Sequence, residues 1–212
     1  MKECDWLMSS RHDKGWDRIY HRYRPECLPW ELGKPRKVLV ELIDSGLVVP
    51  AETLDLCCGA GTNPVYLAKK GFSVTTLDVS DKAVEYAKKR AHEAEVEVSF
   101  LVGDFLDLPF KREQFDFVFD FGCFHHVQAK DRIAFIKGVY RVVKPKGTYF
   151  LICFSYKNEQ AWNHFRREQI IELFGDLFEI KWIKHVSSLE GDGVTRYFYE
   201  TLMKRSTKQI MK

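Results

Sequence analysis

Acidic side chains stand near the ends of several predicted strands, and their spacing gives the first indication of chemistry. Asp78 closes the β-compatible run S-V-T-T-L-D-V at residues 73–79, and Asp55 precedes it in T-L-D-L-C-C-G-A-G-T-N-P, residues 53–64. The carboxyl ends of parallel strands meet at one edge of a sheet, where ligands bind. An acid at the end of the second strand can accept hydrogen bonds from ribose hydroxyls. The spacing therefore predicts a nucleoside site at that edge.

Residues 53–64 are predicted to run from a buried strand through a glycine turn into a helix. Gly59 and Gly61 permit backbone conformations and a close ligand approach that a Cβ forbids. Asn63 and Pro64 suit a helix start. In the dinucleotide fingerprint G-x-G-x-x-G/A the third small residue would fall on Pro64, which disfavours a close contact between the helix and a pyrophosphate. The turn therefore favours a nucleoside ligand over a dinucleotide.

Two further acids extend the series. Asp104 follows the alternating strand predicted at residues 96–102 and is a further strand-end carboxylate; the alternative is an exposed loop acid. Asp120 lies near the end of the apolar strand F-D-F-V-F-D-F, residues 115–121. A carboxylate buried there needs a partner, and a cationic part of the ligand or the second substrate would supply one.

His125 and His126 follow that strand in G-C-F-H-H-V, residues 122–127. A metal site would need a third ligand, and the other candidates are scattered along the chain, so we predict no metal. A histidine near its ordinary pKa of about 6.5 can take a proton at neutral pH. Either histidine is therefore a candidate base or acceptor-orienting group, and packing or helix capping is the alternative for both.

Helical and β-compatible stretches alternate along the chain, which predicts βαβ units around a parallel sheet. Helices are predicted at residues 38–45, 65–70, 81–95 behind a Ser80 N-cap, 133–143 and 167–174. Strands are predicted at residues 53–57, 73–78, 96–102, 115–121, 148–154, 177–186 and 197–203. We expect one domain over residues 1–212, divided into a leader at 1–50, a ligand-binding core at 51–155 and a C-terminal helix and strand hairpin at 156–212.

Composition limits the class of protein. The 212 residues are 45% apolar and carry a net charge of +3, enough for one sizeable core and too little charge to require a nucleic-acid partner. No stretch has the roughly 18 apolar residues of a membrane span, and the first residues do not read as a signal peptide. The six cysteines form no C-x-x-C pair, which favours reduced thiols and a cytoplasmic location.

These motifs resemble a known family. Residues 53–64 resemble the D-x-G-C-G-x-G corner of class I S-adenosylmethionine-dependent methyltransferases, with Asp55 at the acidic position and Cys57 in place of the first glycine. The run P-W-E-L-G-K-P at residues 29–35 looks like the P-W-[DE]-x-G-x-P segment of the thiopurine, halide/thiol and tellurite-resistance type methyltransferases, where the tryptophan lies beside the cofactor. F-D-F-V at 115–118 and K-P-K-G at 144–147 also match family habits.

The resemblance implies a Rossmann-like α/β fold with seven strands in the order 3-2-1-4-5-7-6 and an antiparallel last hairpin. It also implies S-adenosyl-L-methionine as cofactor and S-adenosyl-L-homocysteine as product. Cofactor contacts are expected from Trp30, Asp55, Cys57, Gly59, Gly61, Asn63, Asp78, Val79, Asp104, Phe105 and Asp120. His125, His126 and Asp120 are the candidate catalytic residues.

The methyl acceptor is expected to be a small molecule such as a thiol, a halide or an oxyanion, and the aromatic leader is expected to form a lid over the reacting methyl. No nucleic-acid or membrane partner is expected. The alternatives are an RNA or protein methyltransferase, a nucleotide-binding dehydrogenase and a catalytically silent cofactor-binding module. Neither the acceptor's identity nor the oligomeric state follows from the sequence.

Overall fold

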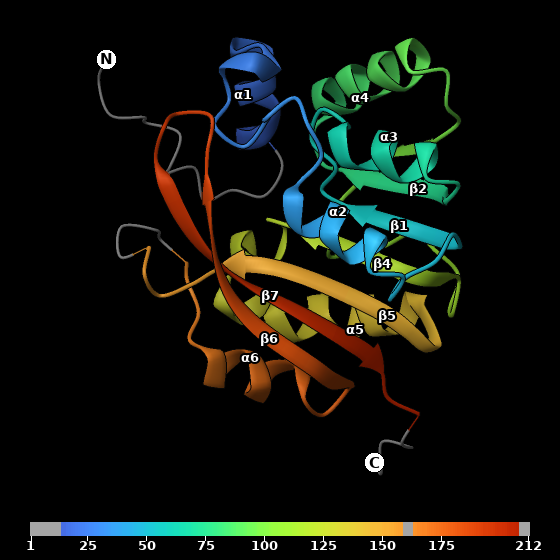
Figure 1. Ribbon diagram of the computed structural model, residues 1–212, viewed down its shortest axis with the longest axis vertical. Helices are drawn as coiled ribbons and strands as arrows, with labels where there is room; N and C mark the ends of the chain where they lie inside the picture. Colours follow the sequence, from blue (N-terminus) through green and yellow to red (C-terminus); the bar gives the residue numbers. More distant parts are fainter. Residues whose placement is uncertain (1–13, 159–162, 208–212) are drawn as a thin grey trace.

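The computed structural model describes residues 14–158 and 163–207, and its centre is one seven-stranded sheet (Figure 1). The strands are β1 (Glu52–Leu56), β2 (Ser73–Asp78), β3 (Ser99–Val102), β4 (Phe115–Phe121), β5 (Val143–Phe154), β6 (Phe178–Leu189) and β7 (Thr195–Arg205). Their order is β3-β2-β1-β4-β5-β7-β6, which confirms the order expected from the family resemblance.

The five strands from β3 to β5 run parallel, and β7 is antiparallel to both β5 and β6. The predicted strand hairpin at the end of the chain is therefore confirmed. In the register of the sheet, Asp55 pairs with Thr76 of β2 and with Phe119 of β4, so β1 is a central strand. β3 lies at one edge and is only partly covered, as its alternating sequence predicted.

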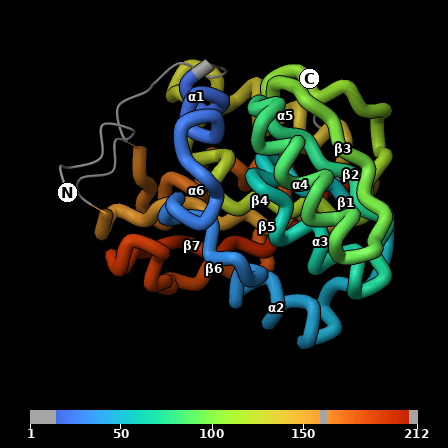
Figure 2. The backbone as a smooth tube through the Cα atoms, turned by 90° about the horizontal axis from the view of Figure 1, so that it is seen from above, coloured from blue at the N-terminus to red at the C-terminus, as the bar shows by residue number. Residues whose placement is uncertain are grey.

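Helices cover both faces of the sheet. They are α1 (Lys14–Arg22), α2 (Lys37–Asp44), α3 (Thr62–Lys69), α4 (Asp81–Glu93), α5 (Arg132–Val142) and α6 (Arg167–Phe174), with short 3-10 helices η2 (Pro25–Cys27), η3 (Phe124–His126) and η4 (Ala129–Asp131). The predicted N-cap of α4 is confirmed, because the Ala83 N–H donates to Ser80 Oγ at 3.0 Å. Seen from above, the strands lie between α2 on one side and α5 on the other (Figure 2).

Two apolar clusters fill the space between the sheet and its helices. One joins residues of α5 and α6, such as Phe135 and Phe174, to Leu54 and Tyr149 of the sheet. The other joins α2 and α3 to the opposite face, where Leu39 packs with phenylalanines of β4 and β5. The sheet is thus buried on both faces, as a parallel sheet requires, and its carboxyl-end edge is left to the loops.

Several element boundaries differ from the sequence-based expectation. α3 begins at Thr62 rather than at residue 65, because Gly61 adopts a left-handed conformation (φ 83°) at the N-cap and Pro64 is tolerated in the first helical turn. β5 begins at Val143, so K-P-K-G lies within its span. Among the described residues no helix is long and apolar enough to cross a membrane.

The cysteines differ from the expectation of reduced thiols throughout. The structure joins Cys57, after β1, to Cys123, after β4, in a disulfide with a Cα–Cα distance of 5.6 Å. Adjacent parallel strands bring the two residues together although 66 positions separate them in sequence. The spacing of the cysteines along the chain could not reveal this pairing.

Candidate active site

A cavity of about 180 Å³ lies at the carboxyl ends of β1, β2 and β4. Its walls come from the leader, the glycine turn, the loop after β4 and the turn between β6 and β7. Of the predicted site residues, the cavity is lined by Trp30, Cys57, Gly59, Asn63, Asp78, Val79, Phe105, His125 and His126. Asp55, Gly61, Asp104 and Asp120 are not among its lining residues. The strand-end edge predicted for the ligand is thus where the cavity lies.

The glycine turn needs glycine at two positions. Gly59 has φ 54°, and a Cβ added there would lie 2.6 Å from Glu31 Oε1. Gly61 has φ 83°, and its Cβ would lie 2.6 Å from the Cβ of Ala87 on α4. Both conformations lie in the left-handed region that glycine adopts at little cost. Gly59 therefore permits a close approach beside the cavity, whereas Gly61 permits close packing of α3 against α4.

Asp78 forms the polar wall between the glycine turn and α4. Its Oδ2 accepts the Gly59 N–H at 2.9 Å, and its Oδ1 accepts the Ser80 N–H at 3.0 Å. Burial raises the pKa of Asp78 to about 6, against the lowering effect of these backbone hydrogen bonds. A carboxylate offers about four lone-pair positions, so Asp78 keeps acceptor capacity for ligand hydroxyls.

Glu31 is a site residue that the sequence analysis did not single out. Its Oε1 accepts the Ala60 N–H at 2.7 Å and the Tyr20 hydroxyl at 3.0 Å, and the Trp30 indole N–H donates to that same hydroxyl at 2.9 Å. Burial raises the pKa of Glu31, although the Ala60 hydrogen bond and the Arg90 charge lower it. The available signal was its position as the acid of P-W-[DE]-x-G-x-P.

A buried ion pair holds the leader against the end of the sheet. Both oxygens of Glu190, in the turn between β6 and β7, accept from Arg36 Nη1 at 2.8 Å. Arg36 also donates to the Trp30 carbonyl at 2.8 Å and lies over the Phe121 ring at 4.0 Å. The Gly191 N–H donates to the carbonyl of Pro29 at 2.8 Å. Residues 29–36 are therefore fixed to the hairpin tip.

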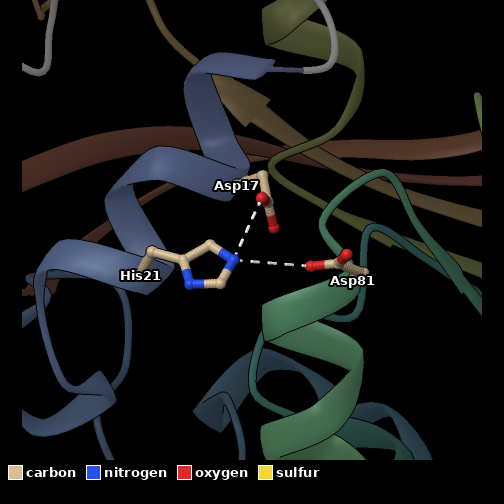
Figure 3. A group of neighbouring side chains, drawn as sticks. All are labelled: Asp17, His21 and Asp81. Atoms are coloured by element: carbon tan, nitrogen blue, oxygen red, sulfur yellow. Dashed lines mark ion pairs between the residues drawn. The ribbon is translucent and has the colours of Figure 1, made fainter.

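The helix α1 is fixed to the start of α4. Asp17 Oδ1 accepts from Ser80 Oγ at 2.7 Å and from the Lys82 N–H at 3.2 Å. His21 Nε2 lies 3.3 Å from Asp17 and 3.7 Å from Asp81. The imidazole points at both carboxylates (Figure 3). Ligand atoms of these three residues are close enough to share an ion, but the cluster is largely exposed and none of the three lines the cavity. We interpret it as a contact between two helices.

Asp120 lies behind the cavity wall. Its Oδ1 accepts the Cys123 N–H at 2.8 Å and the Phe124 N–H at 3.4 Å, and its Oδ2 accepts the Tyr149 hydroxyl at 2.9 Å. Burial raises the pKa of Asp120 to about 7, although these hydrogen bonds lower it. The partner that a buried acid needs is thus provided by the protein. Asp120 positions η3, the short helix that carries both histidines.

The other two acids outside the cavity differ in burial. Asp55 is buried, and its Oδ2 has no hydrogen-bond partner among the described residues. Burial is the main cause that raises the pKa of Asp55 well above its ordinary value, and the charge of Asp120 raises it further. Asp104 is exposed and accepts the Leu106 N–H at 2.8 Å. Its position favours the alternative of a loop acid, whereas the neighbouring Phe105 is buried and lines the cavity.

His125 is buried, and its Nδ1 is hydrogen-bonded within the protein. Nδ1 accepts the Phe154 N–H at 3.2 Å, and the ring stacks on that of Phe154 at a centroid distance of 3.8 Å. Burial lowers the pKa of His125 well below its ordinary value, so the ring is neutral. A neutral imidazole with Nδ1 as acceptor carries its proton on Nε2. His125 therefore offers a hydrogen-bond donor rather than a base.

His126 is half-buried at the same wall. Its ring meets the Trp16 ring edge-on at 4.6 Å, and Trp16 meets Trp30 in the same manner at 5.4 Å. The aromatic leader thus contacts the histidine loop directly across the cavity. Trp16 and Trp30 pack against the apolar cluster around Tyr20 and Ala60, and both also line the cavity.

Comparisons with known proteins agree with this geometry. Residues 53–147 match the family model described as "Methyltransferase domain". An uncharacterised methyltransferase of Synechocystis is 39% identical over 101 residues, covering 48% of this chain and 46% of that protein. A probable thiol methyltransferase of Arabidopsis thaliana is 29% identical over 150 residues, covering 70% of this chain and 65% of that protein.

The solved structures show the same fold. A structure from work on the conversion of a disulfide bond into a thioacetal group during echinomycin biosynthesis superimposes with a TM-score of 0.81 at 23% identity, covering 92% of this chain and 93% of that one. The methyltransferase-domain match and the strand order confirm the resemblance to the class I S-adenosylmethionine-dependent methyltransferases. Residues 53–147 match this methyltransferase domain, and the chain spans 46% and 38% of the length of the first two curated relatives.

The residues present fit the cofactor of that class. Asp78 keeps acceptor positions for ribose hydroxyls, and Gly59 leaves the turn open to close approach. Val79 and the buried Phe105 give an apolar surface for a base. Asp55 lies behind these walls, and its raised pKa favours the neutral acid, so it supplies no counter-charge to the cofactor.

Proposed function

We propose that this protein transfers a methyl group from S-adenosylmethionine to a small-molecule acceptor. The observation that carries the proposal is the cavity at the carboxyl ends of β1, β2 and β4, with Asp78 and Phe105 in its walls and the leader across it. When bound, the cofactor supplies an electrophilic methyl group on a sulfonium. The chain's own residues have to bind it, align the acceptor and exclude water.

Cofactor binding is assigned to four parts of the cavity. Asp78 would accept from the ribose hydroxyls, and Val79 with Phe105 would contact the adenine. The glycine turn at Cys57–Gly59 and the loop after β4 would face the methionine part. Trp30 would cover the cofactor from the leader side, since its indole is held by the Tyr20 hydroxyl.

A small acceptor is favoured by the closure of the site. Trp16 and Trp30 lie against the glycine turn and the histidine loop, and the buried Arg36–Glu190 pair fixes the segment that follows. A macromolecular acceptor such as RNA or protein would have to displace these contacts. The similarity to a probable thiol methyltransferase also favours a small acceptor.

The histidines support an acceptor that is already nucleophilic. His125 presents an Nε2–H donor. This group can orient the acceptor by a hydrogen bond to its oxygen or sulfur atom, but it cannot take a proton. His126 is the remaining candidate base at this wall. A thiolate, a halide or an oxyanion needs no strong base, so in-line transfer would require mainly positioning. Asp120 would act through η3 and not by contact with the substrates.

Calorimetric titration tests the cofactor, and a screen tests the acceptor. S-adenosylmethionine and S-adenosylhomocysteine are expected to bind and to raise the melting temperature, because a ligand of the native state stabilises it by mass action. NAD is the control. Binding of NAD without binding of either sulfur compound would refute the proposal. A methyl-transfer screen over thiols, halides, oxyanions and small amines identifies the acceptor; turnover on RNA or protein alone would refute the small-molecule assignment.

A further inference from the structure

Cys57 and Cys123 form a bond inside the wall of the proposed cofactor cavity. Both residues line the cavity, one from the end of β1 and the other from the end of β4. The strands that carry them are hydrogen-bonded neighbours, with Leu56 opposite Asp120. The two sulfur atoms are therefore held near each other by the sheet whether or not they are bonded.

Cys57 occupies a backbone conformation that suits glycine. Its φ is 55°, in the left-handed region, where a residue with a Cβ costs about 1–2 kcal/mol. Strain of this kind persists where the surroundings impose it and is concentrated at functional sites. The side chain gained at this cost is a thiol directed at a second thiol. This observation, independent of the bond itself, points to a role for the Cys57 sulfur.

The two partners differ in access. Cys57 is half-buried and Cys123 is buried, with 1% of its surface exposed. Cys123 is also held by its own N–H, which donates to Asp120. An incoming reagent therefore meets Cys57 first, and Cys123 is placed to resolve the product. This is the arrangement of an attacking and a resolving thiol.

We propose that Cys57 and Cys123 are a reversible redox pair whose state sets the affinity of the cavity for the methyl donor; the affinity part rests on the proposed function. A low-molecular-weight disulfide is the oxidant. The Cys57 thiolate attacks one of its sulfurs, its S–S bond breaks and one small thiol leaves with the proton from Cys57. The Cys123 thiolate then attacks Cys57 Sγ, and the second small thiol leaves with the proton from Cys123. Two protein thiols are oxidised and one small disulfide is reduced.

The direction of the effect follows from the geometry. The disulfide ties the glycine turn to the loop that carries η3 at the cavity wall. Reduction therefore lets the glycine turn and η3 move apart at the cavity wall. The reduced protein is expected to bind S-adenosylhomocysteine more tightly, by about fivefold or more, the lower end of ordinary coupling between two sites. By reciprocity, the ligand makes the pair harder to oxidise by the same factor.

The test uses the full-length chain in mixtures of reduced and oxidised glutathione. Thiols are counted in the denatured protein and the linked peptides are identified by mass. The oxidised form is expected to show two fewer thiols than the six of the sequence, with Cys57 linked to Cys123, and to return to six on addition of reduced glutathione. S-adenosylhomocysteine affinity is then measured by calorimetry on both forms.

Three variants separate the pair from the other cysteines. Cys123→Ser and Cys57→Gly are expected to lose the response of affinity to glutathione, whatever their absolute affinity. Cys27→Ser, an exposed cysteine outside the cavity, is the matched control and is expected to keep it. Linkage of Cys57 to the adjacent Cys58 would overturn the assignment of the pair.

Two further results would overturn the proposal. One is a pair that never forms, or that reduced glutathione does not open in the folded protein. The other is equal affinity of the two forms. If neither form binds S-adenosylhomocysteine, the proposed function and the effect on affinity both fail, whereas the thiol count still decides whether the pair is reversible.

Discussion

Replacing Asp78 by asparagine tests the structural account of the cofactor site most directly. The side chain keeps its shape, but the amide has one acceptor oxygen where the carboxylate uses two, one for the Gly59 N–H and one for the Ser80 N–H. Hydrogen bonds to a charged acceptor are worth about 1.5–3 kcal/mol. Asp78→Asn is therefore expected to weaken S-adenosylhomocysteine binding about ten- to 150-fold.

The pH dependence of binding makes the prediction sharper. With a pKa of about 6, Asp78 is mostly protonated at pH 5. If the ionised form binds the ribose, the dissociation constant of the natural protein rises about tenfold for each pH unit below 6, since one unit is worth about 1.36 kcal/mol. The Asp78→Asn variant is expected to lack this rise. Glu31 also faces the glycine turn. Because it is present in both proteins, its titration cannot cause a difference between their pH profiles.

Isothermal calorimetry with S-adenosylhomocysteine from pH 5 to pH 8 supplies the measurement. Asp104→Ala is the matched control, because Asp104 is an exposed acid beside the same strand ends that does not line the cavity. It is expected to change affinity less than Asp78→Asn at every pH. An unchanged dissociation constant for Asp78→Asn, or a natural protein whose affinity is flat below pH 6, would refute the assignment of Asp78 to the ribose.

Three further predictions concern the turn, the buried acid and the leader. Gly61→Ala is expected to lower the free energy of unfolding, measured in urea, by about 3 kcal/mol, because the added Cβ would meet Ala87. Gly46→Ala is the control: Gly46 also has a positive φ but has open space around it, so the loss should be about 1 kcal/mol. Equal losses in the two variants would contradict the packing explanation. Asp120 has a folded-state pKa of about 7, above its ordinary value of 3.8. Its contribution to stability is therefore full below about pH 4 and is lost as the pH rises through about 7. Asp120→Asn should remove this decline in the free energy of unfolding, measured by denaturation at several pH values, and an unchanged decline would show that another group causes it. Deleting residues 1–28 should leave a folded protein that binds S-adenosylhomocysteine several-fold more weakly and loses most methyl transfer, and Trp30→Ala should weaken both; turnover of a confirmed acceptor at the full-length rate would show that the leader only packs.

The alternation of helices and strands was readable from the sequence because periodicity and turn residues are local properties. The Ser80 N-cap and strand β4 were placed correctly for this reason. The order of the strands came from the family resemblance, since periodicity does not say which strands are neighbours. The start of α3 was missed because it depends on the left-handed conformation of Gly61.

The candidate site was predictable in its acids and less so in its partners. The end-of-strand position of Asp78 follows from the pattern, and the need of Asp120 for a partner follows from burial. That this partner is Tyr149 and the start of η3, instead of a ligand cation, depends on long-range packing. Arg36 and Glu190 are 154 residues apart in sequence. No local pattern links them, so their ion pair could not be predicted.

The Arg36–Glu190 pair has a consequence for how this protein can be remodelled. Both partners lie outside residues 53–147, the part that matches the general methyltransferase model. The segment before that part and the hairpin after it meet through this pair and through the Gly191 contact to Pro29. A chimera that takes only one of the two from another enzyme would leave a buried charge without its counter-charge, which costs about 3–5 kcal/mol. The two segments are therefore to be exchanged as one unit.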